Sequence, residues 1–174
     1  MNNFDKNWRS AKKSIFRLEG RAEYRLPEDQ ENFAKWKKGE TDLSADKEWQ
    51  KSLKNAKTKG IAVQRVRVVQ NPLPDYIKFQ INVWQKNHTK SVEELFFLNN
   101  DDYKEIIAGL GFNPKDFWLF DDEKLLILNF GTAGQFTGEI LIADQGMAKR
   151  YSDLKIKLLQ RSTPMELFIK KMPQ

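Results

Sequence analysis

The pattern of hydrophobic and polar positions predicts a β-hairpin in the most apolar stretch of the chain, residues 116–130. This stretch consists of two short apolar runs separated by an acidic segment at residues 121–123. Two such runs joined by a short polar turn are typical of a hairpin, and we place it at the centre of a sheet. Alternation assigns its aromatic and aliphatic side chains to two faces: Phe117 and Leu119 on one, Trp118 and Phe120 on the other.

Helical spacing of apolar residues predicts helices toward both ends of the chain. Over residues 1–15 the spacing indicates an amphipathic helix docked on the body, and the alternative is a frayed arm with aromatic anchors. Cap residues and glycines mark the ends of further helices. These are expected at residues 28–38, at 44–57 with Ser44 as N-cap, at 102–110 with a capping box of Asp102 and Glu105, at 144–158, and from Thr163-Pro164 onward.

Further strands are predicted where β-branched residues cluster, at residues 61–69, 92–98 and 136–143. Residues 75–87 are ambiguous, because they fit a helix of about 13 residues and a strand over 77–84 equally well. The chain is therefore expected to be a single α+β domain spanning residues 1–174. Its sheet is expected to be mainly antiparallel, with a C-terminal meander and with N- and C-terminal helices packed against it.

Composition and charge narrow the classes of function. The chain has 174 residues, 40% of them hydrophobic, and no cysteine, so disulfides and thiolate chemistry are excluded and a cytoplasmic location is expected. No apolar run approaches the length of a membrane span, and the first residues lack a signal-peptide core. The net charge of +6 is concentrated at the two ends, with +5 over residues 1–60, −3 over 61–142 and +4 over 143–174. A solvated lysine surface or a phosphate-rich partner would account for this distribution.

Most kinds of catalytic or metal chemistry find no support in the sequence. The single histidine, His88, lies in a polar turn, and no dinucleotide or P-loop motif occurs. Pro74-Asp75 and the later Asp122-Glu123-Lys124 have the letters of a metal-dependent nuclease, but those acids lie in a tight turn rather than on a strand. We therefore expect no catalytic residues, no metal and no cofactor.

Arginines are the most informative polar residues, since the chain has 22 Lys but only 8 Arg. Arg65 and Arg67 lie on one face of a predicted strand, and two neighbouring guanidiniums in a sheet need anions. Internal carboxylates would form a structural network, whereas an external phosphate or carboxylate would make the pair a binding site. The carboxylates that could pair internally are Glu19, Glu93, Glu94, Asp116 and Asp121. The candidate polar network or ligand site comprises Arg17, Glu19, Arg65, Arg67, Asp116, Asp121 and Asp122.

Three segments together resemble a bacterial domain family that has no established activity. They are Phe16-Arg-Leu-Glu19, Arg65-Val-Arg-Val-Val69 followed by Pro72-Leu73, and Asp116-Phe-Trp-Leu-Phe-Asp-Asp122. The resemblance covers residues 16–170, and the family is abundant in actinobacteria near helix-turn-helix regulators. This chain departs from it in being rich in lysine and in having Ser91-Val-Glu-Glu94 where a Gly-Glu is typical. The resemblance implies association with transcriptional regulators or mobile elements.

The sequence thus favours a non-enzymatic regulatory or protein-interaction module, working with a transcriptional regulator or mobile element and without a membrane partner. One alternative is nucleic-acid binding through basic helical faces, although no helix-turn-helix pattern is visible. The other is an enzyme or a binder of a phosphorylated ligand at an arginine-lined cleft.

Overall fold

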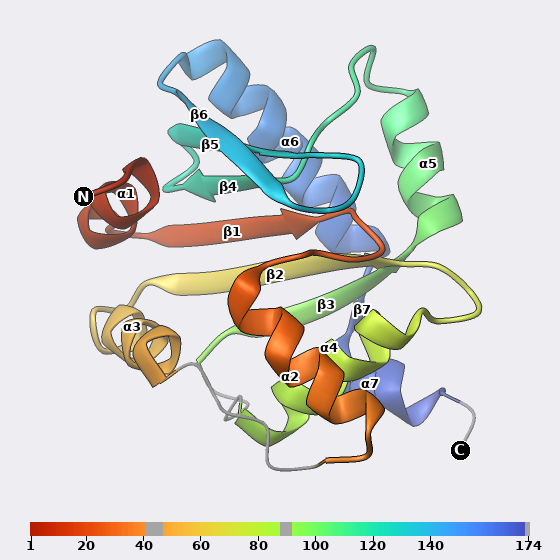
Figure 1. Ribbon diagram of the computed structural model, residues 1–174. Helices are drawn as coiled ribbons and strands as arrows, with labels where there is room; N and C mark the ends of the chain where they lie inside the picture. Colours follow the sequence, from red (N-terminus) through yellow and green to blue (C-terminus); the bar gives the residue numbers. More distant parts are fainter. Residues whose placement is uncertain (41–46, 88–91, 173–174) are drawn as a thin grey trace.

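Helices cover both faces of one mixed sheet in this protein (Figure 1). The computed structural model describes residues 1–40, 47–87 and 92–172, so the predicted Ser44 cap and the turn around His88 lie outside the described residues. The helices are α1 (Asn3–Ser10), α2 (Pro27–Lys37), α3 (Lys47–Thr58), α4 (Asp75–Asn87), α5 (Asn100–Ala108), α6 (Gln145–Arg161) and α7 (Met165–Lys170). The strands are β1 (Ser14–Glu19), β2 (Ala62–Val69), β3 (Glu94–Asn99), β4 (Phe117–Phe120), β5 (Lys124–Phe130), β6 (Phe136–Ile142) and β7 (Thr163–Pro164).

The strands lie in the order β6-β5-β4-β1-β2-β3-β7. β1 pairs in parallel with β2, and β2 with β3, whereas the other neighbouring strands run antiparallel. The predicted α+β class, the mainly antiparallel sheet and the C-terminal meander of β4, β5 and β6 are therefore confirmed. The central strand, however, is β1, which the apolar pattern did not identify, and the hairpin lies beside it.

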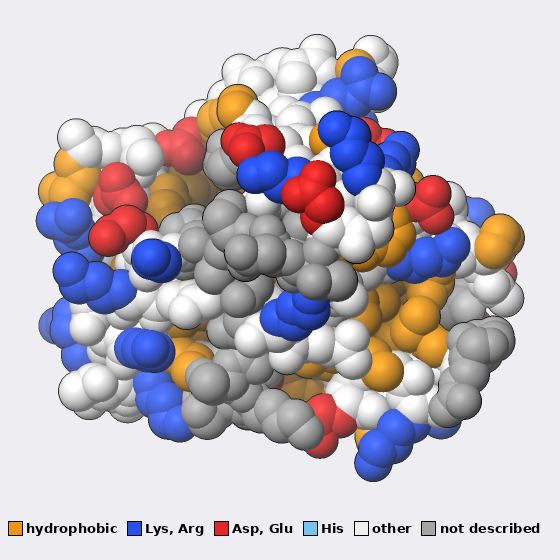
Figure 2. Space-filling model, turned by 60° about the horizontal axis from the view of Figure 1, so that its bottom comes forward, with side chains coloured by type: hydrophobic (Ala, Val, Ile, Leu, Met, Phe, Trp, Pro, Cys, Tyr) orange, Lys and Arg blue, Asp and Glu red, His pale blue; other side chains and the backbone are white. Residues whose placement is uncertain are grey.

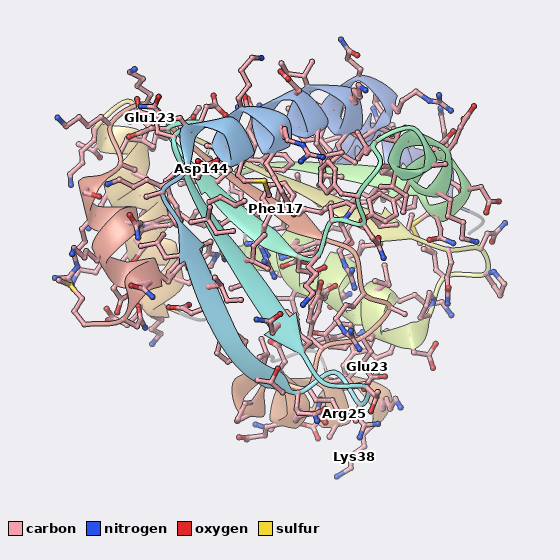
Figure 3. All side chains as sticks on the ribbon, turned by 90° about the horizontal axis from the view of Figure 1, so that it is seen from above. Glu23, Arg25, Lys38, Phe117, Glu123 and Asp144 are labelled. Carbon is pink, nitrogen blue, oxygen red and sulfur yellow. The ribbon has the colours of Figure 1, made fainter. Side chains whose placement is uncertain are left out.

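One face of the sheet is apolar and is covered by α5 and α6. Tyr151, Leu154 and Leu158 of α6 are buried against Phe16, Leu18, Val66 and Val68 of the sheet. The Tyr151 ring meets the Phe117 ring edge-on, with 4.8 Å between centroids. Seen from above, Phe117 lies between the sheet and α6 (Figure 3). This face supplies a continuous hydrophobic core.

The other face is divided between two groups of helices. α1 and α3 cover β4 and β5 with Phe4, Trp8 and Trp49, while α4 and α7 cover β3. α2 packs on α4 rather than on the sheet, through Phe33 and Phe79. In Figure 1, α1 and α3 lie at the left and α2 and α4 below the sheet. The two groups flank the middle of this face, where β1 and β2 carry their charged side chains.

The β4–β5 hairpin is confirmed, and its acidic turn has a specific structural role. Asp121 and Asp122 have φ angles of 55° and 60°, and the Glu123 N–H donates to the Phe120 carbonyl at 3.0 Å. Positive φ at both central residues is the type I′ geometry that suits a hairpin. The Asp121 carboxylate accepts from the backbone N–H groups of Lys12, Lys13 and Ser14 at 2.7–3.1 Å. The turn therefore fixes the start of β1.

This anchoring explains why the predicted N-terminal helix over residues 1–15 was too long. α1 ends at Ser10, and the Asp121 hydrogen bonds draw residues 12–14 toward the sheet. Ile15, the last residue of the predicted helix, is instead fully buried in β1. The frayed-arm alternative does not apply, since α1 packs on the sheet through Phe4, whose ring centroid is 5.0 Å from that of Trp118.

The ambiguity at residues 75–87 is settled in favour of a helix, and the strand alternative is wrong. The apolar residues of α4 are dense because two sides of the helix are buried. Ile77, Ile81 and Trp84 face β3, whereas Tyr76 and Phe79 face α2. A helix buried on two sides loses the single stripe that identifies a surface helix.

Two predicted caps also differ in the structure. α5 is capped by Asn99, whose side chain accepts a hydrogen bond from the Asp101 N–H at 2.8 Å. The predicted capping-box residues, Asp102 and Glu105, both pair with Arg161 of α6 instead. Thr163 and Pro164 form β7, which pairs with β3, so α7 begins one residue later without a side-chain cap. In both places a tertiary contact replaces the local cap.

Candidate functional site

The register of the parallel strands brings charged side chains together on the divided face of the sheet. Arg17 of β1 lies opposite Arg65 of β2, and Glu19 lies opposite Arg67. Because side chains alternate along a strand, all four lie on the same face. Their exposed fractions range from 1% for Arg67 to 8% for Arg65, so this is a buried cluster rather than a solvated surface.

Glu19 is the shared anion of the cluster. Its Oε1 accepts a hydrogen bond from Arg65 Nη1 at 2.5 Å and lies 3.5 Å from Arg17 Nε, and its Oε2 lies 3.7 Å from Arg67 Nε. Arg65 also donates from Nε to Glu93 Oε1 at 2.8 Å. Two carboxylates therefore hold Arg65, while Glu19 is divided among three guanidiniums.

The three arginines differ in how fully they are bonded. Arg67 donates to the Gln80 side chain and to the backbone carbonyls of Glu19, Arg21 and Ala22, which ties the segment after β1 to β2. Arg17, in contrast, donates no side-chain hydrogen bond to any described residue, and its buried Nη1 is left without a partner there. Its contacts are ion pairs at 3.5 Å to Glu19 and 3.7 Å to Asp116, and the Trp118 ring, whose centroid lies 5.2 Å from Arg17 Cζ. Arg17 is thus the loosest member of the cluster.

Asp116 extends the cluster toward the start of the hairpin. Its carboxylate accepts from the Gly20 N–H at 2.9 Å and from the Tyr24 hydroxyl. Burial and the nearby Asp116 charge raise the pKa of Tyr24 well above its ordinary value. Tyr24 therefore acts as a neutral hydrogen-bond donor, and it also lies beneath the Arg67 guanidinium, 5.2 Å from ring centroid to Cζ.

The two glutamates of the cluster have opposite pKa shifts. Burial alone would raise the pKa of Glu19, but the charges of Arg65, Arg17 and Arg67 outweigh burial and lower it. For Glu93 burial is the stronger effect, and its pKa is raised despite the bond to Arg65. Glu19 is therefore held as a carboxylate, whereas burial disfavours the charged form of Glu93.

A cleft of about 480 Å³ lies over this cluster, between the two groups of helices. Arg17, Arg65 and Glu19 are part of its lining, which also includes Trp49 of α3 and Trp84 of α4. The rings of Trp49, Trp84 and Trp118 each lie 5.7–5.9 Å from Arg65 Cζ, within the range of cation–π attraction. The cleft thus combines a charged floor with aromatic walls.

The structure brings five of the seven predicted site residues together: Arg17, Glu19, Arg65, Arg67 and Asp116. Asp121 and Asp122 lie apart, in the β4–β5 turn, where Asp121 binds backbone N–H groups and Asp122 pairs with Lys155 at 2.5 Å. Of the other carboxylates expected to pair with the arginines, Glu93 does so, and Glu94 instead accepts from Gln64.

Sequence reasoning missed the aromatic residues as parts of a site. Trp49 falls in the helix predicted at residues 44–57 and Trp84 in the ambiguous segment 75–87, and neither was assigned to the site, nor was Trp118 of the hairpin. Alternation places Trp118 on the same strand face as Phe120, but its position opposite Arg17 depends on the register of β1 and β4. No local signal places α3 and α4 on either side of β2, because that arrangement depends on tertiary packing.

Other features of the described residues bear on function. A second hollow of about 430 Å³ lies between α1 and α3 and is lined in part by Arg9, Lys51 and Lys59. Within residues 1–40, 47–87 and 92–172, no cluster of three or more potential metal ligands occurs. Nor does any helix of this part of the chain have the length and apolarity needed to cross a membrane.

One of three comparisons with known proteins, that with family models, agrees with the resemblance seen in the sequence. No curated protein matches the chain. Among solved structures, the chain is similar to TrmBL2, described as an archaeal chromatin protein with a novel mode of DNA binding, at 11% identity and a TM-score of 0.48. That match covers 92% of this chain and 49% of the other, so the chain spans about half the length of TrmBL2. The model of a domain of unknown function, DUF6879, matches residues 2–170. This match confirms the predicted membership of an uncharacterised family. The chain belongs to the DUF6879 family.

Proposed function

We propose that this protein is a non-enzymatic regulatory module that binds a small molecule in the aromatic cleft. The observation that carries the proposal is the cleft itself, whose volume of about 480 Å³ lies over a buried arginine–glutamate cluster. Small-molecule sites are usually concave, mainly apolar and supplied with a few oriented polar groups, with volumes of roughly 300–1,000 Å³. The cleft has each of these properties.

Binding is favoured over catalysis by the chemistry of the cleft floor. A general base works best when its pKa lies near the working pH. The guanidiniums lower the pKa of Glu19, which makes it a weak base, and arginines stay protonated. The chain has no cysteine and one histidine, which further limits nucleophilic chemistry. The cluster is therefore suited to holding charge in place rather than to transferring protons.

A thermal-shift screen with a blocking variant tests this proposal. Val83, on α4, lines the cleft, so Val83→Trp would fill it, and Ile156→Trp places the same side chain on α6, across the sheet. A ligand at 100 times its Kd stabilises a protein by about 2.7 kcal/mol. At about 2–4 °C per kcal/mol for a chain of this size, the melting temperature should rise by about 5–11 °C.

The shift should disappear in Val83→Trp and persist in Ile156→Trp. A diverse small-molecule set that gives no shift with the unmodified protein would count against the proposal. So would shifts that survive in Val83→Trp, since the compounds would then bind elsewhere. Ligand-observed NMR on the same variants would show whether binding itself, rather than stability, has changed.

We propose nucleic-acid binding through α3 as a second candidate function, because three of its lysines make no ion pair with the part of the chain that the structure describes. Lys51, Lys54 and Lys57 are exposed and make no ion pair with any described residue. Figure 2 shows Lys and Arg side chains along the left edge of the molecule, on the side where Figure 1 places α1 and α3. Such a row can contact successive phosphates and makes affinity depend on salt.

An electrophoretic mobility-shift titration at increasing salt tests this second function. Replacing Lys51 and Lys54 with Gln should weaken duplex binding and reduce its salt dependence by about two charges. Replacing Lys149 and Lys157, which lie on α6, provides the charge-matched control. Equal loss in the two double variants, or no binding at low salt, would reject the α3 surface.

A further inference from the structure

We infer that the cleft takes a planar aromatic anion, meaning a flat ring system that carries a carboxylate or phosphate group. This inference rests on the proposed small-molecule function and specifies the ligand class. It follows from two properties of the cleft: an arginine on its floor that makes no side-chain hydrogen bond to the described residues, and tryptophan rings in its walls.

Some arginine donors on the floor lack acceptors among the described residues, and two carboxylate oxygens of the cluster, Glu19 Oε2 and Glu93 Oε2, accept no hydrogen bond from these residues. Arg65 uses Nε and Nη1 to bind Glu93 and Glu19, while its Nη2 donates to none of the described residues. Arg17 makes no side-chain hydrogen bond within the described part of the chain, and its Nη1 is buried without a partner there. Buried donors are nearly always satisfied, so Arg17 Nη1 calls for an acceptor atom, which a ligand in the cleft can supply. A carboxylate or phosphate supplies several acceptors at once.

Arg17 is also the arginine best able to adjust to a ligand. Its two carboxylate contacts, at 3.5 and 3.7 Å, are beyond hydrogen-bond distance. Because no hydrogen bond fixes the guanidinium, it can turn toward an anion without breaking one. Arg67, in contrast, is held by Gln80 and by backbone carbonyls, so it supports the floor but is not expected to contact a ligand.

Neighbouring acids do not cancel this preference for an anion. On the floor, Glu19 is already shared among three guanidiniums, and Glu93 accepts a hydrogen bond from Arg65 Nε at 2.8 Å. At the rim, Asp29 accepts from the Tyr76 hydroxyl at 2.7 Å, and Glu139 accepts from the Asn3 N–H at 3.2 Å. Both rim carboxylates are therefore engaged by donors of the chain.

The walls select a ring. Trp49, Trp84 and Trp118 surround the Arg65 guanidinium, and Phe79 and Phe130 add further aromatic surface. Aromatic rings pack favourably on other rings and on guanidinium planes. A cationic ligand is disfavoured, because Arg65 already occupies the centre of the three tryptophans. A flat ring can pack on the tryptophans of the walls while its anionic group contacts the arginines of the floor.

Titration calorimetry with matched probes tests the inference. Indole-3-acetate and adenosine 5′-monophosphate combine a ring with a carboxylate or a phosphate. Acetate and inorganic phosphate carry the charge alone, and indole and adenosine carry the ring alone. At least one ring-bearing anion should bind about tenfold or more tightly than either of its halves, because charge-assisted hydrogen bonds add to ring packing. Comparison of the two families shows whether the carboxylate or the phosphate is preferred.

Variants locate the binding. Arg17→Gln should weaken binding of the ring-bearing anion by about tenfold or more, whereas binding of the neutral ring should change little. Val83→Trp should abolish binding of both the anion and the neutral ring, and Ile156→Trp should leave the binding of both unchanged. Should Arg17→Gln fail to fold, as judged by circular dichroism, the affinity ratios of the unmodified protein and the Val83→Trp result decide the question.

The outcomes separate this inference from the proposed function. Neutral or cationic rings that bind the cleft as tightly as the anions would overturn the ligand class but leave small-molecule binding intact. Acetate or phosphate binding as tightly as the ring-bearing anions would likewise overturn the need for a ring. Binding of neither these probes nor a diverse compound set would overturn both the ligand class and the proposed function.

Discussion

Replacing Glu19 with Gln would remove the shared anion of the buried cluster while preserving its shape. The side chain is 6% exposed and lies within 3.7 Å of a guanidinium nitrogen from each of Arg17, Arg65 and Arg67. After the change, three guanidiniums would share Glu93 and Asp116. Removing one partner of a buried ion pair costs about 3–5 kcal/mol, because the remaining charges are left uncompensated in a poorly solvated place.

That cost is large relative to the stability of an ordinary domain, roughly 5–15 kcal/mol. For a chain of this size each kcal/mol lowers the melting temperature by about 2–4 °C, so Glu19→Gln should melt about 6–20 °C lower. Urea unfolding at neutral pH would measure the free energy of unfolding directly. The matched control is Glu94→Gln, the same chemical change on an exposed side chain that binds Gln64, for which we expect a change below about 1 kcal/mol.

The effect of Glu19→Gln should depend on pH in a defined direction. The folded-state pKa of Glu19 is lowered, so its carboxylate stabilises the fold above the unfolded-state pKa of glutamate, and this contribution is lost as pH falls through the lowered value. The stability difference between the unmodified protein and Glu19→Gln should therefore be full at neutral pH and shrink in acid. A difference that matches that of Glu94→Gln, or that stays constant into acid, would refute the role given to Glu19.

Three further changes test other parts of the fold. Asp121→Ala should lower the free energy of unfolding in urea by about 2–4 kcal/mol, since it removes a charged acceptor of three N–H groups and puts alanine at positive φ. Asp121→Asn should lower it by less, and equal losses in the two variants would contradict this role. Tyr24→Phe should lower the free energy of unfolding by about 1–3 kcal/mol, because buried Asp116 loses a hydrogen-bond donor. Spectrophotometric titration should show one fewer tyrosine that resists deprotonation at high pH, and an unchanged titration profile would contradict the raised pKa of Tyr24. Leu154→Ala, in the core under α6, should cost about 2–5 kcal/mol by thermal melting, and a loss no larger than that of exposed Ile156→Ala would contradict its burial.

The sequence predicted the elements whose polarity pattern matched their burial. The hairpin was recognisable because both its faces are apolar and its turn is polar, and the α6 helix because only one stripe is buried. β1 was missed for the opposite reason. Its inward positions include Arg17 and Glu19, so a strand buried at the centre of the sheet carries charged residues where the alternation rule expects apolar ones.

The candidate site was predictable only as far as strand alternation reaches. Arg65 and Arg67 fall on one face by their spacing of two, which indicates that each guanidinium needs an anion nearby. The pairing with Arg17 and Glu19 depends on the parallel register of β1 and β2, which are separated by α2 and α3 in the chain. The cleft depends further on where α1, α3 and α4 dock, and no residue spacing encodes that arrangement.

The position of the charged cluster within the sheet is better explained by binding than by stability. A buried ion network recovers its desolvation cost only with good geometry, and apolar residues in the same places are often equally or more stabilising. The same two strands show that apolar packing is available, since Phe16, Leu18, Val66 and Val68 fill their other face beneath α6. The charges instead occupy the face that lies under the aromatic cleft, where Arg17 lacks hydrogen bonds to the described residues. The buried atoms Arg17 Nη1, Glu19 Oε2 and Glu93 Oε2 make no hydrogen bond to the described residues, so the network does not satisfy all its own polar atoms. The loosely held Arg17, which lines the cleft, is the member best placed to bind a ligand there.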